Sequence, residues 1–196
     1  MKFVISSTAL FSHLQAIGRV INSKNTLPIL DCFLLELNDG VLSLTASDNE
    51  TTMATSLEVN ESDGNCRFAI NAKTILDALK EIPEQPLTFD FNPNTLEILV
   101  QYMNGRYSVV AQNADEYPIP VTLGETAVHV EMEASTLLNG INRALFATAD
   151  DELRPVMNGI FFDMMEDKVV LVATDAHRLV RYTNTAVSAP NAMSFI

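Results

Sequence analysis

The sequence predicts an α+β fold with antiparallel sheet on one side and a few helices on the other. Three observations indicate this fold. Three stretches carry apolar residues at helical spacing, the segments after them alternate like strands joined by turns, and the chain contains an internal repeat. The 196 residues are 47% hydrophobic and 19% charged, which is enough apolar material for a buried core.

The repeat appears when the chain is shifted by 127 residues. The segment 27–48, "LPILDCFLLELNDGVLSLTASD", then lies without a gap over 154–175, "RPVMNGIFFDMMEDKVVLVATD". Asp48 meets Asp175 in this alignment, and the apolar positions agree almost throughout. A fainter repeat at a shift of 65 places "FVISSTALFSHL" over "FAINAKTILDAL". Such self-similarity indicates duplicated structural units.

The repeats predict the domain organisation. Domain one is expected to span residues 1–123 and to consist of two similar halves, 1–65 and 66–123. Residues 124–196 then form the first half of a second domain, because the chain stops where the second half of domain one begins. We therefore expect the chain to be a fragment of a longer protein.

Helices are predicted where apolar residues recur every three or four positions. The first spans Ser7–Ile21, with Ser7 or Thr8 as its N-cap. The second spans Ala72–Ile82, where Pro83 ends it, and the third spans Ala134–Thr148.

Strands follow each of the first two helices. Asn38-Asp39-Gly40 separates two apolar runs and predicts a tight hairpin. Residues 87–111 are typical of three strands, with turns at Asn92-Pro93-Asn94 and Asn104-Gly105.

Composition limits where the protein acts. No apolar run approaches the roughly 20 residues of a membrane span, and the first residues lack the apolar core of a signal peptide, so we expect a cytoplasmic protein. Cys32 and Cys66 have no metal-binding spacing and are expected to be buried free thiols, with no metal or cofactor. The net charge of −13 taken alone argues against a nucleic-acid partner.

The stretch "VATDAHR" at 172–178 is the main chemical candidate. Asp175 could orient His177 as a general base, but no nucleophile motif, phosphate loop or zinc motif accompanies them. Because Asp48 repeats Asp175, we expect this aspartate to shape a turn by accepting backbone hydrogen bonds. His177 and Arg178 are not repeated. Three interpretations therefore remain open for them: a functionless surface histidine, a binding surface, and catalysis or metal binding.

Basic residues gather on the predicted helices. The stretches 6–27, 72–82 and 134–149 contain only two acidic residues, Asp77 and Glu81, although the chain has 25. The same stretches contain five of the 12 basic residues: Arg19, Lys24, Lys73, Lys80 and Arg143. Either the enrichment is chance on solvated faces, or a polyanion passes along the helical side in weak, sequence-independent contact.

Three motifs carry a resemblance to one family. They are "TLPIL" at 26–30, "LRPVMNGIFF" at 153–162 and "VATDAHRL" at 172–179. With the tandem repeat, the chain resembles the bacterial DNA sliding clamp, the beta subunit of the replicative DNA polymerase III. The resemblance covers essentially the whole chain.

The resemblance implies a ring without catalytic activity or cofactor. Full-length members contain three similar domains, of which the third is absent here, and two chains close head to tail into a homodimer. Helices line the hole and sheets form the outside. The ring encircles duplex DNA as a processivity factor of replication. It tethers the replicative polymerase, the clamp loader and repair proteins, which bind through short peptide motifs.

The resemblance also implies site residues. Lys24 and Lys73 match DNA-facing positions, to which charge placement adds Arg19, Lys80 and Arg143. Asp150-Asp151-Glu152 departs from the polar DNA-contacting loop of the family and should repel phosphate, and Pro155 and Val156 replace aromatic residues of some members.

Two further surfaces follow from the resemblance. The peptide groove is matched by Arg154, Met157, Thr174, His177, Arg178 and Leu179. The dimer-interface strand is matched within 102–112 by Arg106, Tyr107, Ser108, Val109 and Val110. Without a partner, this strand is expected to be an uncovered edge. We expect the fragment to associate through this edge or through the cut face of domain two, and not to form the ring. A hydrolase using Asp175 and His177, and a β-rich scaffold that never meets DNA, are the competing functions.

Overall fold

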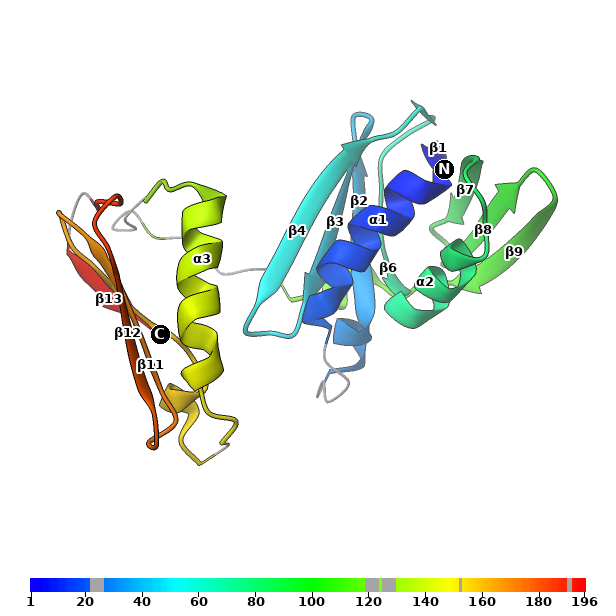
Figure 1. Cartoon of the computed structure of the whole chain (residues 1–196). Helices are drawn as coiled ribbons and strands as arrows, with labels where there is room; N and C mark the ends of the chain where they lie inside the picture. The colour runs from blue at the N-terminus through cyan, green and yellow to red at the C-terminus, as the bar shows by residue number, and fades with distance from the viewer. Residues whose placement is uncertain (22–26, 119–123, 125–129, 152, 190–191) are drawn as a thin grey trace. The chain divides into compact units, whose positions relative to one another are not determined.

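The computed structural model describes residues 1–21, 27–118, 124, 130–151, 153–189 and 192–196 (Figure 1). The chain divides into two compact units, Met1–Val121 and Thr122–Ile196, which we call unit 1 and unit 2. Both combine antiparallel sheet with few helices, which confirms the predicted α+β class. No helix among the described residues is both long and apolar enough to cross a membrane.

Unit 1 contains two antiparallel sheets. The five-stranded sheet has the order β5-β1-β7-β8-β9, and the four-stranded sheet has the order β4-β3-β2-β6. The strands are β1 (Lys2–Ser6), β2 (Cys32–Asn38), β3 (Val41–Ser47), β4 (Thr52–Glu58), β5 (Glu61–Ser62), β6 (Cys66–Asn71), β7 (Pro86–Asn92), β8 (Glu97–Tyr102) and β9 (Gly105–Val110). The helices are α1 (Ser7–Ile17) and α2 (Ala72–Lys80), with short 3-10 turns η1 (Gly18–Val20), η2 (Pro28–Asp31) and η3 (Ala114–Glu116).

The two halves of unit 1 exchange their first strands. β1 from the first half pairs with β7, and β6 from the second half pairs with β2. Phe3 therefore lies opposite Phe89, and the two rings stack with centroids 4.9 Å apart. Each sheet is completed by the other half, so the halves share one apolar core.

The helices of unit 1 lie side by side and cover this core (Figure 1). α1 contacts β1, β3 and β4, while α2 contacts β6. Leu10 and Leu14 on α1 are 0% exposed, as the helical spacing in the sequence requires. Ile75 and Leu79 provide the matching buried face of α2.

The start and end of α1 differ from the sequence prediction. Its N-cap is Ser6, whose hydroxyl accepts a hydrogen bond from the Ala9 amide at 3.2 Å. Ser6 has the extended backbone that an N-cap needs, because it also ends β1. Of the two predicted caps, Thr8 lies inside the helix, and Ser7 is buried with its hydroxyl donating to the Pro83 carbonyl. The α-helix ends at Ile17, and η1 tightens the last turn.

The predicted hairpins are confirmed. Asn38 pairs with Val41, which leaves Asp39 and Gly40 as a two-residue loop with φ angles of 49° and 83°. Positive φ at both central residues is the geometry that suits the right-handed twist of a hairpin. Tyr102 likewise pairs with Gly105 between β8 and β9.

Unit 2 repeats α1, strands β2 to β4 and the start of β6 of unit 1. Its helical elements are α3 (Ala134–Ala144) with the 3-10 turns η4 (Leu145–Ala147) and η5 (Pro155–Met157). Its sheet has the order β12-β11-β10-β13, built from β10 (Phe161–Met164), β11 (Val169–Thr174), β12 (Leu179–Asn184) and β13 (Met193–Phe195). Helix α3 contacts β11 and β12.

The strand register matches the sequence repeat. Phe162 on β10 pairs with Phe195 on β13, and Leu35 on β2 pairs with Phe68 on β6. Both residues of the first pair lie 127 positions after those of the second, which is the shift found in the sequence. The apolar face of α3 is less deeply buried than that of α1, however. Leu137 is 37% exposed, whereas its counterpart Leu10 is 0% exposed.

Candidate nucleic-acid interface and peptide-binding surface

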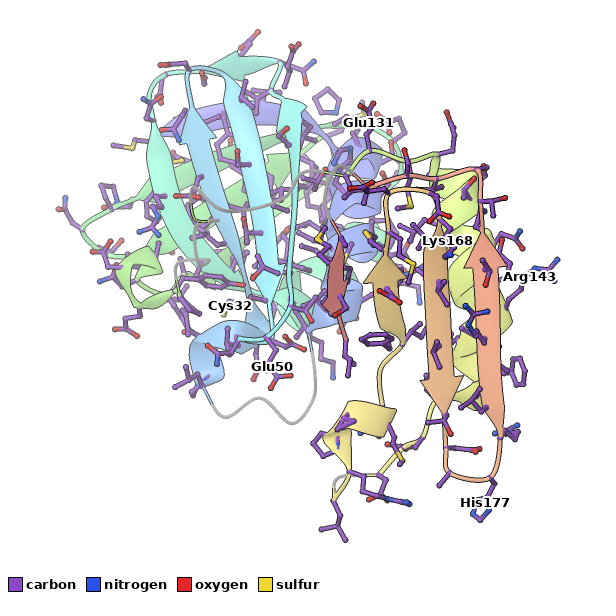
Figure 2. The ribbon with its side chains drawn as sticks, turned by 90° about the vertical axis from the view of Figure 1, so that its left-hand side faces the viewer. Cys32, Glu50, Glu131, Arg143, Lys168 and His177 are labelled. Atoms are coloured by element: carbon purple, nitrogen blue, oxygen red, sulfur yellow. The ribbon has the colours of Figure 1, made fainter. Side chains whose placement is uncertain are left out.

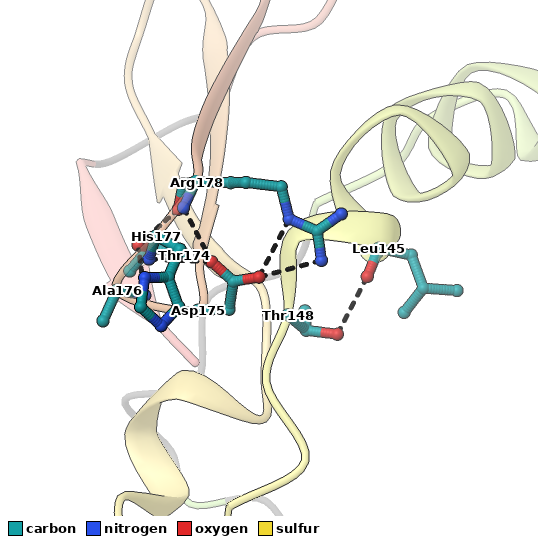
Figure 3. A network of polar contacts seen from close by, with 7 residues as sticks. All are labelled: Leu145, Thr148, Thr174, Asp175, Ala176, His177 and Arg178. Atoms are coloured by element: carbon teal, nitrogen blue, oxygen red, sulfur yellow. Dashed lines mark hydrogen bonds and ion pairs between the residues drawn. The ribbon is translucent and has the colours of Figure 1, made fainter.

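The turn between β11 and β12 is built by side chains that bond to its own backbone (Figure 3). The Thr174 hydroxyl donates to the Arg178 carbonyl at 2.6 Å and accepts from the Ala176 amide at 3.2 Å. Ala176 takes a left-handed φ of 73°, which reverses the chain. The turn is therefore fixed by sequence-local bonds.

Asp175 is the centre of this turn. Its Oδ1 accepts the backbone amides of His177 at 3.0 Å and Arg178 at 2.7 Å. Its Oδ2 accepts Nε and Nη2 of Arg178, both at 2.8 Å. The Arg178 amide and then its guanidinium stabilise the charged form, which lowers the pKa of Asp175 to about 2. The carboxylate is thus committed to Arg178 and the backbone.

This geometry argues against a catalytic pair. His177 contacts Asp175 through its backbone amide, and its side chain is exposed. An imidazole general base is normally oriented by a bond to its ring nitrogen, and Asp175 already uses both oxygens elsewhere. Among the described residues, no three His, Cys, Asp or Glu side chains are grouped to hold a metal ion.

Unit 1 contains the same turn with different side chains. Oδ1 of Asp48 accepts the amides of Glu50 at 3.1 Å and Thr51 at 2.7 Å. Asn49 has a φ of 80°, and the Ser47 hydroxyl donates to the Thr51 carbonyl at 3.1 Å. The prediction that the repeated aspartate shapes a turn is confirmed.

Arg178 makes a second contact that the sequence did not reveal. Its guanidinium carbon lies 5.7 Å from the centroid of the Phe146 ring, in cation–π range. Phe146 belongs to η4, which follows α3, and its side chain is 58% exposed. Arg178 therefore joins the β11–β12 turn to the end of the helix.

A second aspartate–arginine pair lies in the loop before β10. Oδ2 of Asp151 accepts Nε of Arg154 at 2.8 Å, and Oδ1 accepts the Leu153 amide at 2.9 Å. The bond from the Arg154 side chain, followed by that from the Leu153 amide, lowers the pKa of Asp151. One acidic group of this loop is therefore paired locally, and Glu152 lies outside the described residues.

The predicted groove residues fall into two groups at one end of unit 2. Thr174, His177, Arg178 and Leu179 lie in or beside the β11–β12 turn, whereas Arg154 and Met157 lie in the loop that contains η5. Figure 2 shows this loop and the turn, marked by His177, at the same end of the sheet.

Both groups are bordered by apolar side chains that face solvent. Leu153 is 92% exposed, Val156 62% and Leu179 67%, and Met157 is half-buried. Exposed apolar side chains gathered in this way are typical of an interaction surface. Phe146, Asp151 and Asp175 support this surface but are absent from the predicted groove. The D-x-x-R spacing at 151–154 and 175–178 was the available sequence clue.

The predicted DNA-facing cations are exposed where they are described. Lys73 and Lys80 lie on α2, Arg19 on η1 and Arg143 on α3, while Lys24 lies outside the described residues. Lys73 and Lys80 are seven positions apart, which places them close to one face of α2. Arg143 bonds Asn139 at 2.9 Å and lies 5.8 Å from the Tyr182 ring centroid, so its side chain is partly held against β12.

The predicted interface strand forms one edge of the five-stranded sheet. β9 follows β8 as the last strand in the sheet order. Arg106, Ser108 and Val110 are exposed, with Val110 at 70%, while Tyr107 and Val109 pack against the core. The outer edge and one face of β9 are therefore free for pairing within the described structure.

The two cysteines are buried free thiols, as predicted. Burial raises the pKa of Cys32 and of Cys66 to about 11. Both thiols are therefore protonated at neutral pH and unreactive.

Comparisons with known proteins agree with this architecture. A beta sliding clamp of Haemophilus influenzae is 31% identical over 180 residues, which cover 91% of this chain and 48% of the relative. A beta sliding clamp of Synechococcus elongatus is 29% identical over 195 residues, which cover 97% and 51%. The chain thus spans about half the length of these curated relatives.

Solved structures give the same match. The DNA polymerase III subunit beta of Pseudomonas aeruginosa superposes with a TM-score of 0.90 at 26% identity, covering 100% of this chain and 52% of that one. The Helicobacter pylori beta clamp bound to DNA ligase peptide has a TM-score of 0.88 at 19% identity, with coverages of 99% and 55%, and shows likeness of fold alone.

Family descriptions account for the chain from end to end. The N-terminal domain of the DNA polymerase III beta subunit matches residues 1–122, and the central domain of the same subunit matches residues 120–196. The chain therefore belongs to the DNA polymerase III beta subunit family, the family of the bacterial sliding clamps.

Proposed function

We propose that this chain is part of a ring-shaped sliding clamp that encircles duplex DNA and acts as a processivity factor of replication. The observation that carries the proposal is the family match over both units, at the level of sequence and of fold. The clamp has no catalytic role and needs no cofactor, because it holds DNA by enclosing it. Its expected location is the cytoplasm.

The distribution of charge supports weak contact with DNA. The protein carries a net charge of −13, yet Arg19, Lys73, Lys80 and Arg143 are exposed on helical elements. Lys24 is included on its sequence position alone. Lysine and arginine contacts to phosphate do not read the base sequence, and a few of them favour encounter without stopping movement along the duplex.

The exposed apolar end of unit 2 supports binding of partner peptides. We propose that Arg154, Met157, Thr174, His177, Arg178 and Leu179 form part of a groove for short motifs in polymerase, clamp loader and repair proteins. A clamp of the same fold, that of Helicobacter pylori, has been solved with a DNA ligase peptide. Apolar side chains at such a groove receive the hydrophobic side chains of a bound peptide.

The free edge of β9 supports ring closure. Residues Arg106 to Val110 present unpaired backbone groups on their outer side, and we propose that this edge joins a second chain in a homodimer. Heterologous contacts of this kind close into a ring when the rotation between subunits closes.

Retention on circular DNA tests the clamp function. A clamp that carries these 196 residues as its N-terminal part should stay bound to nicked circular DNA through gel filtration and be lost once the circle is cut. Equal retention on both forms would indicate ordinary binding, and no retention on either would favour a scaffold that never meets DNA. For the hydrolase alternative, His177→Ala should abolish turnover of some substrate, whereas the clamp requires only altered partner binding.

A further inference from the structure

Unit 2 differs from unit 1 at one position in the repeated turn and at one position in the 3-10 turn after the helix that together form a new contact. At the position of Thr51, unit 2 has Arg178, and at the position of Arg19, in η1, it has Phe146, in η4. The backbone bonds made by Asp48 and Asp175 are the same in both units. What unit 2 adds is a series of interactions from Asp175 through Arg178 to Phe146, which we call the clip (Figure 3 shows its Asp175–Arg178 part).

The clip gives the guanidinium of Arg178 two contacts. Nε and Nη2 both bond Oδ2 of Asp175 at 2.8 Å, and the Phe146 ring faces the guanidinium carbon at 5.7 Å. A planar guanidinium combines an ion pair with aromatic stacking in a way that a lysine ammonium cannot. Arg178 also closes the turn, because its carbonyl accepts the Thr174 hydroxyl. The clip therefore adds a restraint on the Arg178 side chain to the backbone bonds that already shape the turn.

We infer that the clip presets the peptide-binding surface, with Asp175 and Phe146 as positioning residues that act through Arg178 to present Leu179. The inference rests on the proposed function of the groove. Leu179 is the next residue after Arg178, and its side chain is 67% exposed, so its own packing does not hold it in place. Ordering the turn during folding removes an entropy cost that binding would otherwise carry.

The clip also defines the chemistry of the peptide. Because Asp175 already neutralises Arg178, an acidic side chain on the peptide gains little at this point. Val156 and Leu179 instead offer exposed apolar surface. The structure thus favours a peptide whose contacting side chains are apolar and uncharged.

The first test measures the free 196-residue protein by NMR. The side-chain Nε–H resonance of Arg178 and the order of residues 176–179 are compared in wild type, Asp175→Asn, Phe146→Leu and Phe146→Tyr. Asp175→Asn keeps an oxygen for the turn amides but loses the charge. We expect the Nε–H signal and the order of the turn to fall in Asp175→Asn and Phe146→Leu, and to be restored by Phe146→Tyr.

Unit 1 provides the matched control. Asp48→Asn makes the same chemical change in the same turn, where Thr51 replaces the arginine, and should leave residues 176–179 unchanged. Should Asp175→Asn unfold unit 2, Phe146→Leu still carries the test, because the ring is more than half exposed. If residues 176–179 are as ordered in Phe146→Leu as in the wild type, the proposed role of the clip is overturned.

The second test uses a clamp that carries these 196 residues as its N-terminal part. A labelled peptide with two adjacent leucines between uncharged polar residues is titrated into it. Affinity should fall about 2- to 5-fold in Phe146→Leu, as expected for removal of one exposed cation–π interaction, and stay near wild type in Phe146→Tyr and Asp48→Asn. Replacing the leucines by aspartates should abolish binding. If wild type shows no saturable binding, the groove and this inference fail together. Undiminished affinity in variants whose turn is disordered would overturn the positioning role alone.

Discussion

Asp48 and Asp175 each accept a hydrogen bond from the backbone amide three residues further on, at 2.7 Å in both units. The two carboxylates form the same turn, but only that of Asp175 is paired, within the described structure, with an arginine side chain. One local structure thus serves as plain scaffold in unit 1 and as part of a candidate binding surface in unit 2.

The stability of unit 2 should depend on pH through Asp175. Its folded pKa of about 2 lies below the roughly 3.9 of an unfolded aspartate, so its contribution is present above about pH 4 and is lost as the pH falls toward 2. Titration of the Asp175 carboxyl carbon by NMR checks this. In Arg178→Leu the midpoint should move up toward the ordinary value, and an ordinary midpoint in the wild type would contradict the pairing.

Replacing Gly40 by alanine should destabilise unit 1 by about 1 kcal/mol, because its φ of 83° is unfavourable for residues with a side chain. Gly64→Ala is the matched control. It likewise has no atom within 4 Å of an added Cβ, but its φ is not in the left-handed region. Urea unfolding of both variants gives their free energies of unfolding and separates the effect of backbone conformation from that of steric crowding. Equal destabilisation of both variants would refute the explanation.

Leu10→Ala should lower the free energy of unfolding by about 2 to 5 kcal/mol. The Leu10 side chain is 0% exposed, and its removal leaves a cavity in the core of unit 1. Its counterpart Leu137 is 37% exposed, and Leu137→Ala should cost clearly less. Denaturant midpoints of the two variants test whether burial, rather than position in the repeat, determines the cost. Equal destabilisation would count against it.

Exchanging Lys73 and Lys80 for glutamate should weaken DNA retention by the clamp and flatten its dependence on salt. Removing one lysine–phosphate interaction lowers the slope of log affinity against log salt by about 0.9. Lys2→Glu is the control, because Lys2 lies on β1 and pairs with Asp90 at 3.2 Å. Filter binding over a salt series makes the measurement, and an unchanged slope would remove both lysines from the interface.

The free edge of β9 should let the 196-residue protein self-associate at high concentration. Val110→Lys places a charge on this edge and should shift sedimentation equilibrium toward the monomer. Val41→Lys serves as the control, because Val41 is also exposed, at 41%, but lies on a strand paired on both sides. A wild-type protein that stays monomeric throughout would rule out association through β9.

Periodicity in the sequence predicted the helices and hairpins well, because the features that determine them are local. Asp39-Gly40 forms its turn by its own φ preferences, and Leu10 and Leu14 share a helix face by spacing alone. The N-cap of α1 was predicted at Ser7 or Thr8, one or two residues late, because Ser6, Ser7 and Thr8 all carry hydroxyls that can cap a helix. The choice depends on β1 pairing with β7 and on the carbonyl of Pro83, both distant in sequence.

In the candidate sites, too, local features were predictable from the sequence and long-range contacts were not. The turn-forming role of Asp175 followed from its repeat, since its bonds are made within three residues. The interaction between Arg178 and Phe146 joins residues 32 positions apart and depends on how η4 packs beside the sheet. The dimerisation strand and the DNA-facing lysines Lys24 and Lys73 follow from the resemblance, whereas Arg19, Lys80 and Arg143 follow from charge placement. All of these roles involve a second molecule, so the fold of one chain does not determine them.

The exchange of β1 and β6 between the halves of unit 1 has a mechanical consequence. A polypeptide cut between residues 62 and 66 yields two pieces, each of which contributes to a sheet built mainly by the other: β1 and β5 join β7, and β6 joins β2. Neither piece should fold in isolation, yet a mixture of the two should assemble spontaneously, as split reporter proteins do. The two halves of unit 1 are therefore complementary fragments that depend on each other for folding and are joined by one short segment of the chain.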